Sequence, residues 1–498
     1  MKCHLFRSTL IYMLVSCLLA FYLSGCGQVK DPGENTKPPS SAATKATEQE
    51  KITLRVAVEE SLDGTMADAH HRFLKELQDK FSLEHREVEI LIERIPREKG
   101  REEVLQRLRA ELMMGEGPDI LLLPTMPTDN RDYFGYVDPL IPDVQMAMRN
   151  GLFLDISEYY DADTALGKEA LNQTVMEAGV LDDARYVLPL VYDMPVAYVV
   201  KDAFAESGVP QDVFSYGATE FLNTVAQLED LADVGSLYQN YSTETPLFFN
   251  FFPELIDYET GQVTVAPEDL EAYFRAWQAH RLKLADAFDA GHGVPGISEI
   301  QYYYGSANYG APGVFWGIDG FYASCESLLS AADIILMADG LGVELDMYPM
   351  RAVDGSVVAD VTFYGAITSG CRNPELAYEF LRQFLNPEFQ HEYNNVSFFG
   401  WPVRTVGSVS PICKRVGSPT FLSTDGMRII KPENMTDEDL PILNAQINHV
   451  RFSILLEVDF GEAVLNLYYN NDPMAVEVDF QEEAEDWVKM LQIHADEG

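Results

Sequence analysis

The sequence predicts an α/β protein built on a largely parallel sheet. Short apolar runs typical of buried strands alternate with stretches in which apolar residues recur at helical spacing. This alternation requires crossover connections, which leave consecutive strands parallel. Hydrophobic residues make up 47% of the 498 residues, so the chain can also bury the large core that such a fold needs.

The first elements are expected in the order strand, helix, strand, helix, strand. A buried strand covers residues 52–58, and a second strand over 88–92 alternates apolar and acidic side chains. The second helix is predicted to end at Gly115, because glycine adopts the left-handed conformation that follows many helices. Residues 119–123 form the third strand. The apolar helix positions are Met66, Phe73, Leu74, Leu77, Phe81, Val104, Leu105, Leu108 and Leu112.

Later elements follow the same logic. Two apolar runs, 186–190 and 196–200, indicate an extended segment that crosses the molecule. A strand over 361–367 leads into a helix over 375–385, which opens with the cap and first-turn pair Asn373-Pro374. The last helix is predicted over about 480–491, with Ala484, Trp487, Val488 and Leu491 facing inward.

The charge balance argues against a nucleic-acid partner. Acidic residues outnumber basic ones 79 to 35, giving a formal net charge of −44, whereas affinity for phosphate comes from Lys and Arg. A cationic ligand or calcium is one interpretation of this excess. A solvated acidic surface that resists aggregation is the favoured one.

The cysteines predict neither a disulfide framework nor a zinc site. Beyond Cys26 only Cys325, Cys371 and Cys413 remain, an odd number with long spacings and no CxxC pair. Buried free thiols are the expected state, and pairing among the three stays open.

The N-terminus resembles a bacterial lipoprotein signal. Basic residues precede an apolar run over 9–23, which ends in Leu23-Ser24-Gly25-Cys26. The resemblance implies that Cys26 becomes the first mature residue and carries lipid, which would tether the chain to the outer face of the cell membrane. A plain transmembrane anchor is the alternative, since the run is close to the roughly 18 to 20 residues that a spanning helix needs. Residues 27–50 are expected to form a flexible linker.

Four segments together resemble the bacterial extracellular solute-binding proteins of the maltose-binding type. They are GEGPDI at 115–120, YVLPLVYDMPVAYVVKD at 186–202, FYGAITSGCRNPELAYEFLRQFL at 363–385 and WPVR at 401–404. The resemblance touches most of the chain from Ile52 onward, although little of 204–313 can be aligned. The identity of the ligand, set largely in that region, is therefore left open.

The resemblance implies a type II periplasmic-binding-protein-like fold. In this fold two lobes, each a mixed sheet flanked by helices, are joined by crossing hinge segments. By this match, lobe 1 combines residues 51–192 with 364–404, and lobe 2 combines 193–363 with 405–498. Gly365, next to a crossing, would either give the hinge its freedom or allow tight packing.

The same resemblance suggests where a solute binds. A sugar needs flat aromatic faces together with carboxylates or amides that accept its hydroxyl protons. Asp193 falls where the family presents an acid to the cleft, and WGIDGFYA at 316–323 is similar to the segment in which an aromatic ring stacks on the ligand. The candidate ligand-binding residues are Glu59, Tyr192, Asp193, Trp316, Asp319, Phe321, Tyr322, Trp401 and Arg404.

The resulting hypothesis is a lipid-anchored solute-binding subunit of an ABC importer, most consistent with a carbohydrate ligand. Its partners would be a small solute, a membrane permease and the lipid at Cys26; no enzymatic activity, cofactor or metal is expected. The chain lacks the GxSxG, HExxH and GxxxxGK[ST] motifs, and Asp119 is predicted to fix backbone rather than to act as a catalytic acid. Two alternatives remain: an exported glycoside hydrolase using Glu59 with Asp193, or a sensory partner of a membrane receptor.

Overall fold

The computed structural model describes most of the chain from residue 51 onward. The described residues are 51–59, 64–96, 99–125, 128–129, 135–136, 138–228, 236–237, 251–287, 321–326, 328–390, 400–404, 421–422, 429–430, 440–447, 449–455 and 479–497. The predicted signal, the lipidation site Cys26, the linker, Trp316 and Asp319 all lie outside them. Within these ranges, no helix combines the length and apolarity that crossing a bilayer requires.

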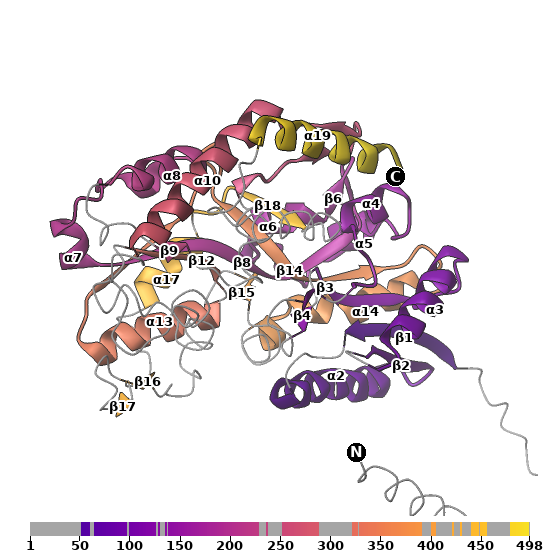
Figure 1. The fold of residues 1–498 in the computed structure, drawn as a ribbon. Helices are drawn as coiled ribbons and strands as arrows, with labels where there is room; N and C mark the ends of the chain where they lie inside the picture. The colour runs from indigo at the N-terminus through magenta and orange to yellow at the C-terminus, as the bar shows by residue number, and fades with distance from the viewer. Residues whose placement is uncertain are drawn as a thin grey trace, which may run out of the picture. The chain divides into compact units, whose positions relative to one another are not determined.

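A ten-stranded mixed sheet forms the centre of the fold, in the order β2-β1-β3-β14-β8-β12-β9 (Figure 1). In addition, β13 and β15 pair with β8, and β18 pairs with β14. The strands are β1 (Ile52–Glu59), β2 (Val88–Ile95), β3 (Ile120–Pro124), β8 (Val187–Val200), β9 (Ser236–Leu237), β12 (Tyr322–Glu326), β13 (Leu345–Pro349), β14 (Val358–Ile367), β15 (Trp401–Pro402) and β18 (Phe452–Leu455).

The sheet is mixed, as the resemblance implied, so the expectation of a largely parallel sheet is wrong. Beyond the first three strands, β14 is parallel to β18 and β12 is parallel to β9. β1 is parallel to both β2 and β3, as the alternating pattern predicts. However, β14 runs antiparallel to both β3 and β8, and β12, β13 and β15 run antiparallel to β8. The two long strands β8 and β14 cross the sheet in opposite directions, so they make it mixed.

Helices cover the sheet, and short hairpins complete the fold. The helices are α2 (Gly64–Glu84), α3 (Arg101–Met113), α4 (Val144–Arg149), α5 (Ser157–Ala162), η2 (Lys168–Ala170), α6 (Gln173–Met176), η3 (Glu177–Gly179), α7 (Lys201–Glu206), η4 (Val213–Ser215), α8 (Ala218–Ala226), α10 (Pro267–Ala287), α13 (Leu328–Leu341), α14 (Pro374–Leu381), η8 (Arg382–Leu385), α17 (Leu440–Ile447) and α19 (Phe480–Glu497). The hairpin pairs are β4 (Thr128–Asp129) with β5 (Gly135–Tyr136), β6 (Val180–Leu181) with β7 (Ala184–Arg185), β10 (Ile256–Asp257) with β11 (Gln262–Val263), and β16 (Phe421–Leu422) with β17 (Ile429–Ile430).

The helix ends follow the sequence signals with one exception. α3 ends just before Gly115, whose φ of 69° is the left-handed conformation that the glycine was expected to supply. Pro374 occupies the first turn of α14, but the side chain of Asn373 makes no capping hydrogen bond. The proline therefore sets this helix start, because its fixed φ suits the first turn. α19 includes the predicted segment and continues to Glu497.

β8 changes its neighbours halfway along its length. Tyr192 and Asp193 are the last residues of β8 to pair with β15 and β14. Met194 is the first residue to pair with β12, and pairing with β13 begins at Val196. The two predicted apolar runs are thus one continuous 14-residue strand, which joins two groups of strands. We call the point between Asp193 and Met194 the strand exchange.

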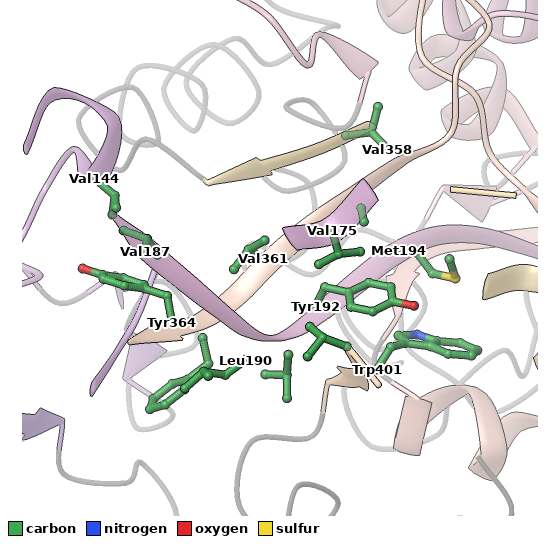
Figure 2. Close-up of a cluster of buried hydrophobic side chains, with 14 of the residues drawn as sticks. Val144, Val175, Val187, Leu190, Tyr192, Met194, Val358, Val361, Tyr364 and Trp401 are labelled. Carbon is green, nitrogen blue, oxygen red and sulfur yellow. The ribbon is translucent and has the colours of Figure 1, made fainter. Parts of the chain in front are cut away.

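An apolar cluster packs around the strand exchange. Figure 2 shows Tyr192, Met194 and Trp401 close to Val361 and Val175. All five side chains are buried. Gly365 on β14 also contributes through close packing, because a Cβ there would collide with Leu381 of α14. This close approach supports the packing interpretation of the glycine, and the hinge interpretation stays a prediction.

Candidate ligand-binding site

Two aspartates occupy directly paired positions at the strand exchange. Asp193 of β8 pairs directly with Asp360 of β14 in the antiparallel ladder. Directly opposed residues point to the same face of a sheet, with Cβ atoms about 4.5 to 5.5 Å apart. Asp193 is half-buried, whereas Asp360 is only 1% exposed. The site thus combines one partly accessible acid with one that is almost completely enclosed.

The environment of Asp360 favours its neutral form. Its Oδ1 has no hydrogen-bond partner within the described chain. Burial raises the pKa of Asp360 well above its ordinary value, because an enclosed carboxylate loses its hydration. No ion pair involving Asp360 is present among the described residues.

Tyr192 and Trp401 occupy the other side of the same crossing. They pair with each other between β8 and β15, and neither side chain has exposed surface. Burial raises the pKa of Tyr192, and its buried hydroxyl has no hydrogen-bond partner among the described residues. In this structure both rings belong to the apolar cluster of Figure 2. Their contact with a ligand stays a prediction.

Phe321 is also a core side chain in this structure. It has no exposed surface and makes edge-to-face contacts with Phe214 and Phe221, with ring centroids 5.7 and 5.2 Å apart. Such pairs are a preferred aromatic geometry. Tyr322 begins β12, where its backbone pairs with Tyr198 and Ser236. Trp316 and Asp319, predicted in the same segment, lie outside the described residues, so this part of the site stays untested.

Glu59 ends β1 and forms an ion pair with Arg101 of α3. The two side chains are only 6% and 7% exposed. Arg101 also donates to the carbonyl oxygens of Asp138, at 2.8 Å, and Pro96, at 3.1 Å. The ion pair gives Glu59 a structural partner, and no described contact links it to Asp193. A role for Glu59 in ligand binding stays a prediction.

Arg404 is buried and joins segments of backbone. Its Nη2 donates to the carbonyl oxygen of Leu166 at 2.6 Å, and its Nε donates to that of Leu385 at 3.1 Å. Burial lowers the pKa of this guanidinium, because desolvation disfavours the charged form. In this structure Arg404 holds the loop before η2 against η8, so its predicted ligand role also stays untested.

The prediction for Asp119 is confirmed. Its Oδ2 accepts a hydrogen bond from the backbone N–H of Arg55 at 2.8 Å, which ties the start of β3 to β1. The neighbouring Cys371 is a half-buried free thiol. Burial raises the pKa of Cys371 to about 12, and Asp119 contributes to the shift. The thiol therefore stays protonated near neutral pH and is a poor nucleophile.

Two acids that the structure makes prominent have only weak signals in the sequence. Asp360 lies one residue before the predicted strand, and its signal was a lone charge inside the apolar run at 357–367. Asp143 caps α4 and also contacts Tyr258 and His494 from distant parts of the chain. Only the fold reveals that second set of contacts. In the described part of the chain, no group of three or more His, Cys, Asp or Glu side chains could hold a metal.

Comparisons with known proteins identify the fold. No family model matches the chain, and no curated protein matches it. Among solved structures, an extracellular solute-binding protein family 1 member from Alicyclobacillus acidocaldarius subsp. acidocaldarius DSM 446 is similar, with 11% identity and a TM-score of 0.50, covering 89% of this chain and 98% of that one. The galacto-N-biose-/lacto-N-biose I-binding protein of an ABC transporter from Bifidobacterium longum has 13% identity and a TM-score of 0.50, with 89% and 98% covered.

A de novo designed cysteine esterase is also similar, with 12% identity and a TM-score of 0.55, covering 90% of this chain and 99% of that one. Identities this low establish the fold and nothing beyond it. The chain has the α/β, two-lobed fold of the extracellular solute-binding proteins of the maltose-binding type. The resemblance found in the sequence is thus confirmed for the fold.

Proposed function

We propose that this protein is the extracellular solute-binding subunit of an ABC importer, with a carbohydrate as its ligand. The observation that carries the proposal is the strand exchange, where one continuous strand passes between two groups of strands and presents Asp193. Two proteins of this fold are described by the sugars they bind: lacto-N-biose in Bifidobacterium longum and acarbose for the GacH receptor of Streptomyces glaucescens.

The proposed lobes meet at this exchange. Lobe 1 would combine residues 51–192 with 364–404, and lobe 2 would combine 193–363 with 405–498. Pairing supports the first boundary, because β8 leaves β14 at Asp193 and joins β12 at Met194. It also supports the second, because β14 pairs with β3 only from Phe363 onward. Changes of φ and ψ at such strand ends can reorient one lobe without breaking either core.

Capture would depend on Asp193 and on rings that closure brings to the solute. A carboxylate accepts hydrogen bonds from sugar hydroxyls, and a stacked ring covers the apolar face of the sugar. The solute favours closure only by the difference between its affinities for the closed and open states. Tyr192, Trp316, Asp319, Phe321, Tyr322, Trp401, Arg404 and Glu59 remain the candidate supporting residues.

We propose that the solute leaves chemically unchanged. The ion pair with Arg101 leaves Glu59 poorly suited to the acid and nucleophile roles of a glycosidase, which need an available carboxyl group. Cys371 is protonated and half-buried, which disfavours an esterase mechanism. Lipid attachment at Cys26 would hold the protein at the outer face of the membrane, beside its permease.

A binding screen tests this function. Oligosaccharides, monosaccharides and polyols are added to the purified chain, and a thermal shift identifies the ligand. A ligand at a hundred times its dissociation constant stabilises by about 2.7 kcal/mol. Small-angle scattering should then show compaction, and chromatography should recover the solute intact. Unchanged dimensions at saturation would contradict hinge closure, and recovery of cleavage products would establish an enzyme instead.

Two matched variants locate the site. Asp193→Asn should weaken binding of the identified solute about 10- to 100-fold, because a hydrogen bond to a charged group contributes about 1.5 to 3 kcal/mol. Asp161→Asn changes an exposed carboxyl group on α5 and should leave the affinity unchanged. Equal affinities for all three proteins, measured by titration calorimetry, would remove Asp193 from the site.

A further inference from the structure

Asp360 is a charged residue type in an apolar, enclosed position. On β14 it lies between Asp193 of β8 and Ile454 of β18, to which it is paired directly. It is 1% exposed, and its Oδ1 lacks a hydrogen-bond partner within the described residues. Hydrogen-bonded carboxylates are common in protein interiors, whereas an enclosed carboxylate without partners is costly.

The described elements around Asp360 offer no cation to offset a negative charge there. On β8 the titratable neighbours are Asp193 and Tyr192. The strands β18 and β15 and the helix α6 contain no titratable side chain. Glu177 of η3 points to solvent with its side chain 64% exposed, 3.7 Å from Arg185. Arg451, just before β18, is exposed, and its Nη1 donates to the carbonyl oxygen of Val450.

Ionisation of Asp360 would therefore place two negative charges directly across the ladder. Like charges at directly opposed positions destabilise strand pairing. The effect is stronger in a poorly solvated site, because the effective dielectric constant there is lower than in water. The affected pairing is that between β8 and β14, next to the point where β8 changes its neighbours.

We propose that Asp360 is a proton-controlled switch at the strand exchange: with its proton in place it permits full β8–β14 pairing, and its ionisation weakens that pairing. No solute is required for this behaviour. The switch therefore goes beyond the proposed function, and a failure of one leaves the other standing.

The sign of the pH effect follows from the raised pKa of Asp360. Between the unfolded and the folded pKa, the folded protein binds more protons than the unfolded chain, so stability falls as the pH rises. The stabilisation is complete below the unfolded pKa of about 3.9 and is lost as the pH passes through the folded pKa. Above the folded pKa this contribution no longer changes.

The test compares Asp360→Asn with the wild type. The asparagine mimics the neutral acid and cannot ionise. Unfolding midpoints in urea are measured on the full chain from about pH 4 to about pH 9. The difference between variant and wild type should grow with pH and then level off. Asp161→Asn, which changes an exposed acid, should give a difference that does not vary with pH.

A second variant tests the coupling to β8. In an Asp193→Asn background, the effect of Asp360→Asn should level off at a lower pH, because removing the carboxylate from the opposing position makes ionisation of Asp360 less costly. If the role of Asp360 were purely structural, the pH at which its effect levels off would not depend on Asp193. The same levelling pH in both backgrounds would overturn the coupling across the ladder.

Infrared spectroscopy tests the proton itself, and its decisive measurement is made on the wild type. With isotope-labelled aspartate, the wild type should show the C=O stretch of a protonated carboxyl group at neutral pH, which disappears as the pH is raised. This band should be absent from Asp360→Asn and present in Asp161→Asn. Absence of the band from the wild type at neutral pH would overturn the proposal, as would a pH-independent effect of Asp360→Asn on the midpoint.

Discussion

Two buried acids join distant parts of this fold, and their surroundings differ sharply. Asp143 belongs to what we call the Asp143 cluster, which also contains Tyr258 and His494. Its Oδ1 caps α4 by accepting from the N–H of Met146 at 2.7 Å. Its Oδ2 accepts from the hydroxyl of Tyr258 at 2.8 Å and lies 2.6 Å from Nε2 of His494. Both oxygens of this carboxyl group are therefore occupied.

The strand exchange has the opposite character. Asp360 Oδ1 and Thr362 Oγ1 are both buried, and neither has a hydrogen-bond partner in the described part of the chain. Thr362 lies where the β8–β14 register shifts, between the pairs of Val361 and Phe363. Such irregularities in a ladder bend the strand and increase its local twist. Polar atoms here thus carry a cost that the Asp143 cluster avoids.

The two sites therefore differ in the free energy that a rearrangement of their contacts would cost. A fully satisfied polar network favours one arrangement, because any displacement leaves several buried groups unpaired. A site with unsatisfied atoms loses less on rearrangement. In the proposed lobe division, Asp143 lies in lobe 1, and Tyr258 and His494 lie in lobe 2. The Asp143 cluster would then fix one contact between the lobes while the strand exchange changes.

The largest expected effect is at the Asp143 cluster. Asp143→Ala removes a helix cap and the acceptor for Tyr258, so we expect the free energy of unfolding to fall by about 3 kcal/mol. Urea unfolding measures this loss. Asp155→Ala is the control, because within the described chain the side chain of the exposed Asp155 makes one local hydrogen bond, with the N–H of Ser157, and its loss should cost about 1 kcal/mol. Equal losses of stability for the two variants would mean that the contacts of Asp143 with Tyr258 and His494 contribute nothing beyond one local hydrogen bond.

The second effect is steric and lies on β14, five residues beyond the strand exchange. Gly365→Ala should destabilise by about 2 kcal/mol, because the added Cβ collides with Leu381. In the double variant with Leu381→Ala, the collision is relieved, so the combined loss should be smaller than the sum of the single losses. Strictly additive losses, measured by chemical unfolding, would show that close packing is not the role of this glycine.

The sequence predicted the local elements well because their signals are local. Apolar periodicity located β1, β2, β3 and α3, and Gly115 marked the end of that helix. The bond from Asp119 to the backbone was also predictable, since an acid at the start of a buried strand has few other uses. Strand direction was not, because antiparallel pairing between β8 and β14 depends on residues about 170 positions apart.

The candidate site was only partly predictable for the same reason. Asp193 was identified through the crossing segment, but its neighbour Asp360 is known only from the register of two distant strands. The sequence does not distinguish aromatic side chains that pack in the core from those that stack on a ligand, because the same residue types serve both roles. The predicted ligand contacts include Tyr192, Phe321 and Trp401, and none of these side chains has exposed surface in this structure. The sequence shows that an aromatic ring is present, but its packing in the fold determines whether a face of the ring is exposed to a ligand.

The third prediction separates the contacts of the Asp143 cluster. Tyr258→Phe removes one hydroxyl that donates to Asp143, and we expect a loss of about 1 kcal/mol. In the Asp143→Ala background the same change should cost much less, because its acceptor is already absent. The double-mutant cycle is measured by urea unfolding. A coupling near zero would show that the hydroxyl contributes independently of the acid, and the cluster would not be a network.

The smallest expected change in stability concerns the hydroxyl of Thr362, which has no hydrogen-bond partner among the described residues. Thr362→Val replaces a buried, unpaired hydroxyl by a methyl group of similar shape, so we expect the stability to stay within about 0.5 kcal/mol of the wild type or to rise slightly. Tyr258→Phe is the matched control, since it removes a buried hydroxyl that does donate. Urea unfolding of both variants gives the contrast directly. If Thr362→Val lowered the stability as much as Tyr258→Phe, the hydroxyl of Thr362 would have to make a stabilising hydrogen bond. The strand exchange and the Asp143 cluster would then not differ in how well their polar atoms are paired.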